Sequence, residues 1–447
     1  MNIVVIGMGE VGKHIASYLA TEKHNVTIID SSQSNLQEAE SVLDALALCA
    51  QGGSPKALRK ANVGEADLVI SVTDNDEVNI LAAHTARALG AKKTIARVAS
   101  REYLDGEAGF YHNLLGIDLV ISPQVLASLE IVKLINSMGA LKIEYFADNK
   151  IEMVRLAVKE QLKILGAKLS DIKMPENTLI AAIHRDGRLL IPSGQDELLL
   201  NDDVFLIGRT EQIPKAEKQF GTRFQTEARN VIICGGGEIG LSVAKTLAGM
   251  ELKITIIERD KERCLELSQQ LSGVMIINGD GTDVNLLEEV NAGQADVFVS
   301  VVSEGEEINL LSGLLAKELG TRKTVVLVHK PAYQELYERL GIDATVSPRL
   351  IAADQVLKYV RGGEIVSVSV LEEGAGEILE FVATENSKIV GKALRDVKLP
   401  RGVLIGAVAG PDGVEVARGD TVIKPDSTVI VFTLPDKRPQ VEKLFRK

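Results

Sequence analysis

One pattern occurs twice in this chain, and it restricts the folds that the sequence can adopt. A short apolar run, Asn2 to Ile6, leads into a turn with the spacing Gly-x-Gly-x-x-Gly, and a second apolar run then ends on Asp30. The same order recurs from Val231 and ends on Glu258. The first glycine and the acid are 23 positions apart in both copies. A recurrence of this length and regularity indicates that a whole domain has been duplicated.

The two glycine turns supply the first candidates for a binding site. Strand, glycine turn, helix, strand and acid, in that order, make the unit that binds dinucleotides in Rossmann-type folds. The first glycine permits a tight turn, the second lets a pyrophosphate approach the backbone, and the third lets helix and sheet pack closely. A vestigial fold that keeps its glycines only for packing is the alternative. The candidates are Gly7, Met8, Gly9, Glu10, Val11 and Gly12 in the first turn, and Gly235, Gly236, Gly237, Glu238, Ile239 and Gly240 in the second.

The acid that closes each unit predicts which nucleotides would bind. Asp30 and Glu258 can accept hydrogen bonds from an adenosine ribose, while the free N–H groups at the start of the helix face the phosphates. Because a carboxylate at this position repels a 2′-phosphate, the pattern favours NAD(H), ADP or ATP over NADP(H).

Further candidates follow two later strands of the first copy. One apolar strand ends at Thr73 and Asp74, and ligands of open α/β sheets lie outside that end of the strands. Arg97 lies in another apolar segment near the same edge, where it could bind a phosphate or pair with an acid. We expect a phosphate, because an arginine is costly to bury without a partner. Asp76 and Glu77 could equally well cap the helix that follows.

The two copies differ at positions that a nucleotide would contact. Asp280 would lie near the adenine or the ribose in the second copy, where the first copy has Gly52. Conversely, the second copy has Leu327 in place of Arg97. We therefore expect the first site to suit a charged pyrophosphate better, and the second to be weaker or differently selective.

Each parallel-sheet region is followed by a stretch of different character. Residues 143–164 alternate between apolar and polar, which indicates antiparallel strands, and Asp186-Gly187 has the composition of a hairpin turn. The helix expected at 124–137 has few strong charges, so it could cross to a partner domain or pack on its own sheet. The fold class is α/β, with two Rossmann-type parallel-sheet domains, each followed by a small α+β domain. The expected boundaries are 1–138, 139–222, 228–362 and 363–447.

Composition excludes several classes of function. The net charge of −12, aromatic content of 4% and absence of Trp argue against nucleic acid and against an anionic membrane surface. The sequence has no run of 18 or more apolar residues, so we expect no membrane span. The strand that begins at Asn2 leaves no room for a signal peptide. Three scattered cysteines fit a reducing cytosol rather than a metal site.

We expect neither catalytic residues nor a metal. The six histidines form no constellation with Cys, Ser or Asp, and an NAD-dependent oxidoreductase, the alternative function, would need a proton relay and a substrate pocket. His184 and Asp186 lie close together at a hairpin turn, where an aspartate is most often structural.

Together these motifs resemble the family of Trk potassium-uptake regulatory proteins (TrkA), whose units are RCK domains, each a KTN domain plus a TrkA C-terminal domain. The resemblance rests on Gly7 to Gly12 with Asp30, on Ser71-Val72-Thr73-Asp74 with Glu77 and Asn79, and on the counterparts of these residues in the second half. The segment Gly279-Asp280-Gly281-Thr282 also fits the family, whereas Gln51-Gly52-Gly53-Ser54 departs from it at the adenosine side of the first site. The resemblance covers essentially the whole chain.

The resemblance implies a cytoplasmic regulatory subunit that binds NAD(H), or ATP and ADP at the same sites. It implies a membrane K⁺ transport subunit of the TrkH or TrkG type as partner, which would hold this chain peripherally at the cytoplasmic face of the inner membrane without insertion. It also implies that the two Rossmann-type domains pair within one chain, and that chains assemble into a homo-oligomer, expected to be a tetramer.

Overall fold

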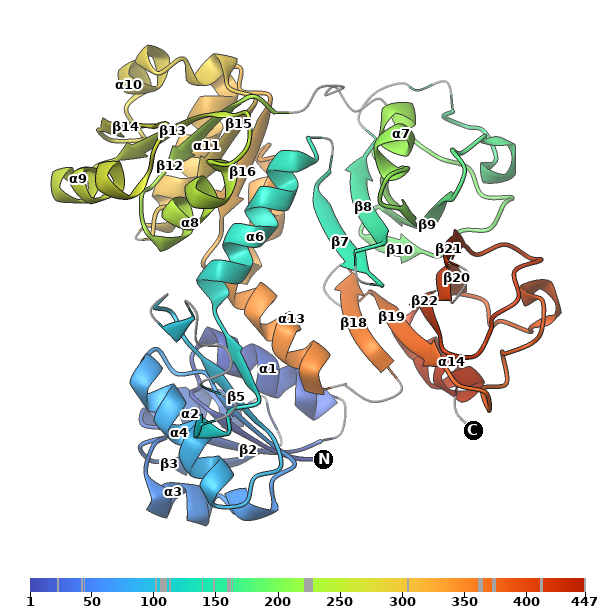
Figure 1. The fold of residues 1–447 in the computed structure, drawn as a ribbon, viewed down its shortest axis with the longest axis horizontal. Helices are drawn as coiled ribbons and strands as arrows, with labels where there is room; N and C mark the ends of the chain where they lie inside the picture. The colour runs from blue at the N-terminus through green and yellow to red at the C-terminus, as the bar shows by residue number, and fades with distance from the viewer. Residues whose placement is uncertain are drawn as a thin grey trace. The chain divides into compact units, whose positions relative to one another are not determined.

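In the computed structural model the described residues form four sheets, which confirms the expected fold class (Figure 1). Two six-stranded parallel sheets and two five-stranded antiparallel sheets alternate along the chain. The chain divides into unit 1, made of Met1–Leu129, Leu327–Gln334 and Val346–Val360, and unit 2, made of the remainder. The structure describes residues 1–445 except 22–23, 42, 44, 101–102, 105–110, 112–113, 139, 148, 159–161, 163, 221–227, 304, 361–364, 372–374 and 411–412, and the side chains of 358 and 365–370.

The first parallel sheet has the strand order β3-β2-β1-β4-β5-β6, which is the Rossmann order. Its central strands are buried on both faces because helices cover both sides. The strands are β1 (Asn2–Ile6), β2 (Asn25–Asp30), β3 (Leu46–Cys49), β4 (Leu68–Ser71), β5 (Thr94–Arg97) and β6 (Leu119–Ile121). The helices are α1 (Glu10–Thr21), α2 (Gln33–Glu40), α3 (Pro55–Lys60), α4 (Asp76–Ala88) and α6 (Pro123–Asn136).

Alternation along β1 divides its side chains between two cores. Ile3 and Val5 pack with α1 and α2, whereas Val4 and Ile6 pack with α3 and α4. Because the strand is apolar on both faces, it can lie only in the middle of a covered sheet. This places its carboxyl end, and the glycine turn that follows, at the centre of the sheet edge.

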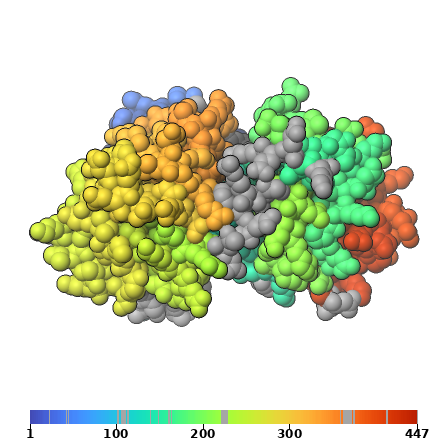
Figure 2. All heavy atoms as spheres, turned by 90° about the horizontal axis from the view of Figure 1, so that it is seen from above, coloured from blue at the N-terminus to red at the C-terminus, as the bar shows by residue number. Residues whose placement is uncertain are grey.

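The second parallel sheet repeats the order as β14-β13-β12-β15-β16-β17. Figure 2 shows the residues of this domain in colours that run from yellow-green through yellow to orange. The strands are β12 (Asn230–Cys234), β13 (Lys253–Glu258), β14 (Val274–Asn278), β15 (Val297–Ser300), β16 (Lys323–Leu327) and β17 (Ala344–Val346). The helices are α8 (Glu238–Leu247), α9 (Lys261–Gln270), α10 (Val284–Glu289), α11 (Glu306–Leu319), α12 (Gln334–Arg339) and α13 (Pro348–Val360).

The last helix of each parallel-sheet domain leaves its own sheet, which decides between the two alternatives left open for the helix at 124–137. Helix α6 starts in unit 1 but belongs to unit 2 from Glu130 on. There the buried ammonium of Lys323 donates to the carbonyls of Leu134, Ser137 and Ala140 at 2.7–2.8 Å, which satisfies the end of the helix. In return, α13 packs against α1 and contributes to the core of the first sheet.

The small domains are five-stranded antiparallel sheets, ordered β10-β9-β11-β8-β7 and β18-β19-β22-β20-β21. The predicted turn is present, since Asp186 and Gly187 both have positive φ between β9 and β10. One core joins the two sheets through Phe205, Ile207, Ile430 and Phe432, among others. The strands are β7 (Lys142–Phe146), β8 (Ile151–Ala157), β9 (Thr178–Arg185), β10 (Arg188–Leu190), β11 (Asp203–Arg209), β18 (Ile365–Leu371), β19 (Gly376–Ala383), β20 (Val403–Gly410), β21 (Gly413–Val416) and β22 (Ser427–Thr433), with helices α7 (Ile213–Glu217) and α14 (Arg438–Phe445).

A buried acid in the first small domain predicts a pH-dependent stability. Burial, together with the carboxylate of Glu217, raises the pKa of Glu152 to about 7. The folded chain therefore holds this proton between the ordinary glutamate pKa and pH of about 7, and stability falls as pH rises through that window. We expect Glu152→Gln to raise the free energy of unfolding by about 1–3 kcal/mol above pH 7, with the gain vanishing near pH 4.5. Denaturant unfolding at several pH values measures this.

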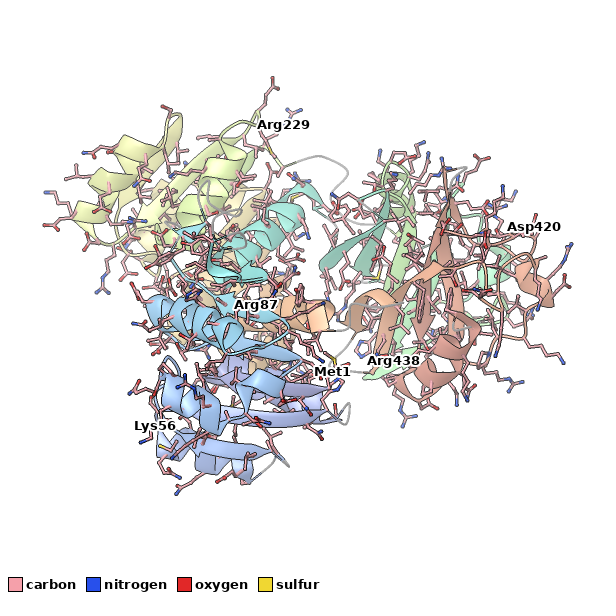
Figure 3. The ribbon with its side chains drawn as sticks, turned by 60° about the horizontal axis from the view of Figure 1, so that its bottom comes forward. Met1, Lys56, Arg87, Arg229, Asp420 and Arg438 are labelled. Carbon is pink, nitrogen blue, oxygen red and sulfur yellow. The ribbon has the colours of Figure 1, made fainter. Side chains whose placement is uncertain are left out.

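The second small domain offers the matched control. Glu377 is equally buried, but it lies 3.5 Å from Nη1 of Arg438, which is labelled in Figure 3. Since its charge is compensated there, Glu377→Gln should bring no gain in stability at any pH. An equal gain in the free energy of unfolding from both variants would show that the loss of stability above pH 7 does not come from the uncompensated charge of Glu152.

Candidate functional site

The first glycine turn has the geometry that its three glycines predict. Gly7 has φ of 100°, and a Cβ there would lie 2.8 Å from the backbone nitrogen of Thr73. A Cβ on Gly12 would lie 1.8 Å from the carbonyl oxygen of Gly7, so helix α1 touches the turn directly. A Cβ on Gly9 would meet no atom within 4 Å. At the first and third glycines the backbone is therefore in close contact with neighbouring backbone atoms, whereas at the second glycine it is open.

Asp30 is held against this turn. Its Oδ2 accepts a hydrogen bond from the backbone N–H of Met8 at 2.5 Å, and its Oδ1 accepts one from the N–H of Ser32 at 2.7 Å. A carboxylate oxygen can accept more than one hydrogen bond, so both oxygens retain capacity for ribose hydroxyls. The acid is therefore oriented beside the open turn.

Several candidates in the turns can contribute only through their backbone. The side chains of Met8, Val11 and Ile239 are buried in the core. Glu10 and Glu238 begin helices α1 and α8, and their side chains are exposed. Because Gly237, the N-cap of α8, has no side chain to accept a hydrogen bond, the first N–H groups of that helix can serve an anion.

Thr73 is positioned by Asn79, a residue of the family motif that was not among the candidate site residues. Asn79 of α4 is fully buried; its Oδ1 accepts from the Thr73 N–H at 2.8 Å, and its Nδ2 donates to the carbonyls of Thr73 and Arg97, both at 2.9 Å. Asn309 binds the loop after β15 in the same way. The two asparagines occupy the same place in both repeats, and the structure gives them the same role.

Arg97 lies next to Thr73, with one nitrogen unused. Its Nη1 donates to the Thr73 carbonyl at 2.6 Å, while its buried Nε has no hydrogen-bond partner. Burial lowers the pKa of Arg97, and the charges of Asp76 and Asp74 oppose that shift. The carboxylate of Asp76 already accepts from the N–H groups of Ala99 and Ser100 at 2.8–2.9 Å. Arg97 thus combines a charge with an unsatisfied donor at the sheet edge.

The helix-capping role considered for the acids after Asp74 falls to another residue. Asn75 is the N-cap of α4, and its side chain accepts from the N–H of Val78 at 2.7 Å. Glu77 instead accepts from the hydroxyl of Tyr103 at 2.9 Å. Asp74 is exposed beside Asn75, in the loop between β4 and α4.

The second glycine turn repeats the first. Gly235 has φ of 105°, and a Cβ on Gly240 would lie 2.0 Å from the carbonyl oxygen of Gly235. The N–H of Gly236 donates to Oε2 of Glu258 at 2.7 Å, in the role that Met8 has in the first turn. The sheet register sets Glu258 beside Asn278, two residues before Asp280. The carboxylate of Asp280 accepts from the N–H and hydroxyl of Thr282 at 2.9 and 2.7 Å.

The second turn has less open space around its backbone than the first. A Cβ on Gly237 would come within 3.0 Å of the Ser303 hydroxyl, whereas the space at Gly9 is open. Arg263 of α9 donates from Nε to the Gly236 carbonyl at 2.9 Å and from Nη2 to Glu238 at 3.1 Å. The sequence analysis missed this arginine, because its reach to the turn depends on how α9 packs. A cation is therefore present at the second turn even though Leu327 replaces Arg97 there.

Each glycine turn thus has a carboxylate oriented beside it, that of Asp30 at the first and that of Glu258 at the second. In the described part of the chain, no group of three or more His, Cys, Asp or Glu side chains could hold a metal ion. The open backbone at Gly9 could receive a pyrophosphate, and the oriented carboxylate of Asp30 could accept hydrogen bonds from an adenosine ribose. Nor is any helix in the described ranges long and apolar enough to cross a bilayer.

Comparison with known proteins gives a consistent result. The TrkA-N domain family matches residues 3–123 and 231–348, and the TrkA-C domain family matches residues 153–221 and 378–446. A Trk system potassium uptake protein TrkA homolog from Archaeoglobus fulgidus is 37% identical over 446 residues, covering 100% of both chains. TrkA homolog 1 from Methanosarcina mazei is 36% identical over 454 residues, with the same coverage. Among solved structures, the GsuK channel bound to NAD has the same fold, with TM-score 0.61 and 16% identity, covering 99% of this chain and 78% of that one.

Proposed function

Because the chain belongs to the TrkA family of potassium uptake proteins, we propose that it is a nucleotide-binding regulatory subunit of a Trk-type potassium uptake system. Its ligand is NAD(H), with ATP and ADP able to use the same sites. The open backbone at Gly9 beside the oriented carboxylate of Asp30 carries this proposal. The relatives to which the chain is similar are named for potassium uptake and not for a reaction.

The two sites have unequal roles in this proposal. The first offers open space at Gly9 and the unused Nε of Arg97, and so it is the stronger site for a pyrophosphate. The second has Ser303 close to Gly237, and the guanidinium of Arg263 already lies across its turn. A ligand entering there must compete with these internal contacts, which supports weaker or different selectivity.

Regulation requires that a ligand bind one conformation better than another. The exchange of α6 and α13 gives each nucleotide-binding domain a helix that starts in the other half of the chain. Nucleotide bound at one sheet edge can thus bias how the two halves pack. In this proposal the domains are 1–138, 139–222, 228–362 and 363–447.

The partner in this proposal is a membrane K⁺ transport subunit of the TrkH or TrkG type, at the cytoplasmic face of the inner membrane. The chain forms a homo-oligomer, a tetramer in the simplest arrangement. Co-purification with that subunit and a nucleotide-dependent change in K⁺ flux test this part of the proposal. Hydride turnover with a substrate panel would instead support an oxidoreductase.

Calorimetric titration of NADH, NAD⁺, ATP and ADP against Gly9→Ala tests the first site directly. The added methyl group meets no protein atom, so the fold is undisturbed, but it occupies the space that a pyrophosphate needs. We expect affinity at the first site to fall about tenfold or more, a loss of about 1.4 kcal/mol or more. Gly249→Ala is the matched control, since its methyl group also meets no atom and lies after α8, at the end of that helix opposite to the second turn.

Asp30→Ala and Glu258→Ala assign the two sites in the same titration. Each variant removes the carboxylate beside one turn and leaves the other unchanged. We expect the first variant to lose the tighter binding event and the second the weaker one. Unchanged binding in both variants would contradict the site assignment.

A further inference from the structure

One lysine of the second nucleotide-binding domain is buried against the end of helix α6. Lys323 is the first residue of β16, and it is only 2% exposed. Its ammonium has three N–H donors, and each binds one backbone carbonyl at 2.7–2.8 Å, those of Leu134, Ser137 and Ala140. The chain from α6 leads directly into β7 of the first small domain. The lysine therefore spends all its donors on the segment that joins α6 to the first small domain.

An acid of the first small domain meets the same segment. The hydroxyl of Ser137 donates to Oε1 of Glu217, the last residue of α7, at 2.7 Å. Burial raises the pKa of Glu217, and the Ser137 hydrogen bond and the charge of Lys323 oppose that rise. Burial lowers the pKa of Lys323 to about 7, and the charges of Asp343 and Glu217 oppose that fall. Because Asp343 already pairs with Lys317 at 2.5 Å, we assign Glu217 as the acid that balances Lys323.

The second small domain balances the equivalent acids within itself. Arg438 begins α14 where Ile213 begins α7, and Glu442 follows Arg438 by four positions, as Glu217 follows Ile213. Nε of Arg438 donates to Glu442 at 3.0 Å, and Nη1 lies 3.5 Å from Glu377. Ile213, by contrast, is a buried member of the apolar core. The first small domain therefore has an apolar side chain at the position where the second has its cation.

The first nucleotide-binding domain has a matching lysine that is not buried. Lys93 precedes Thr94 at the start of β5, as Lys323 precedes Thr324 in β16. Lys93 is exposed, and its ammonium lies 5.0 Å from the centroid of the Tyr359 ring, near the end of α13. A cation–π contact at an exposed site is weak, because water still solvates the cation. The lysines that reach the two crossing helices therefore hold them with unequal strength.

We propose that Lys323 fastens the first small domain to the second nucleotide-binding domain through the charge of Glu217, so that these two domains move as one body. Removing one member of a buried charge pair leaves the other uncompensated, so pulling the two domains apart is costly. The second small domain does not need a cation from another domain for Glu377 and Glu442, because Arg438 supplies one locally. In the regulator proposed above, a change at the second glycine turn is therefore passed rigidly to the first small domain.

Hydrogen exchange of the full chain, read by mass spectrometry in peptides that cover 131–138 and 213–217, tests this joint. We choose about pH 6, below the pKa of Lys323, so that the lysine is charged. Lys323→Met keeps the length of the side chain but removes its charge and its donors. We expect exchange in both peptides to become about tenfold faster or more, because α6 loses its cap and Glu217 loses its counter-charge. Lys93→Met is the matched control and should leave both peptides unchanged.

A double variant separates the balancing of charge from the capping of α6. Glu217→Gln keeps an acceptor for the Ser137 hydroxyl but removes the charge. We expect it to slow exchange in 213–217 by a factor about tenfold larger in the Lys323→Met background than in the parent chain. Glu377→Gln is the charge control: since Arg438 balances Glu377, it should have the same effect on both backgrounds.

Three results would overturn the proposal. One is unchanged exchange in 213–217 for Lys323→Met, and another is an equal effect of Glu217→Gln in both backgrounds, which would leave Lys323 as a helix cap alone. If Lys323→Met yields no folded chain, recovery of folded protein becomes the measurement. Rescue by Glu217→Gln but not by Glu377→Gln then supports the joint, and rescue by both or by neither overturns it. No step uses a nucleotide, so this test is independent of the proposed function.

Discussion

Gly12→Ala is expected to destabilise the first nucleotide-binding domain by about 3 kcal/mol or more and to abolish nucleotide binding there. The new methyl carbon would lie 1.8 Å from the carbonyl oxygen of Gly7 and 2.9 Å from its carbonyl carbon. Both are backbone atoms, so no side-chain rotation can relieve the overlap. Helix α1 would have to move away from the turn, which would disturb the packing of Val11, Ile15 and Leu19.

A competing effect makes this a stringent prediction. Alanine is a better helix former than glycine by about 1 kcal/mol, so a loosely packed α1 would be stabilised by the change. Denaturant unfolding and NADH titration of the variant measure the balance. Gly9→Ala, three residues earlier, serves as the control that should retain stability and lose only binding. An unchanged or higher unfolding midpoint for Gly12→Ala would contradict the close contact of helix and turn.

Asn79→Leu is expected to have an effect of similar size. Its side chain accepts from Ser71 Oγ at 3.1 Å, accepts from Thr73 N and Oγ1 at 2.8 and 2.7 Å, and donates to the carbonyls of Thr73 and Arg97 at 2.9 Å. Leucine fills a similar volume but satisfies none of these groups. Leaving them buried without partners should cost about 3–5 kcal/mol in total and release Thr73 from the sheet edge.

The same variant should also reduce nucleotide affinity at the first site, because Thr73 and Arg97 would no longer be held in place. Unfolding by denaturant, together with titration of NADH, measures both effects. Asn75→Ala provides the comparison: Asn75 is an exposed helix cap, worth about 1 kcal/mol, and Thr73 keeps its anchor in that variant. Equal losses of stability and of NADH affinity from Asn79→Leu and Asn75→Ala would contradict the larger role assigned to Asn79. Asn309→Leu should transfer the effect to the second site.

The residues closest to the glycine turns were the most predictable part of the site. The roles of Gly7 and Gly12 follow from a backbone pattern that spans a few residues, and the structure gives both the close contacts that the pattern requires. Asp30 was predictable for the same reason, since it ends the strand that pairs with β1. Asn79 belongs to the family motif, but neither its role nor that of Arg263 was predicted, because an asparagine or an arginine in a helix has no assignable role until the loop that it binds is known.

The amino-acid sequence by itself determined the local order of elements and the fold class, because strand alternation, glycine spacing and turn residues act over distances of a few positions along the chain. It also determined, through duplication, that the same unit forms twice. Only the tertiary structure decided that α6 and α13 exchange between halves and that Lys323 satisfies the end of α6. Those relations join residues more than 180 positions apart, and only the packing of complete sheets and helices brings such residues together.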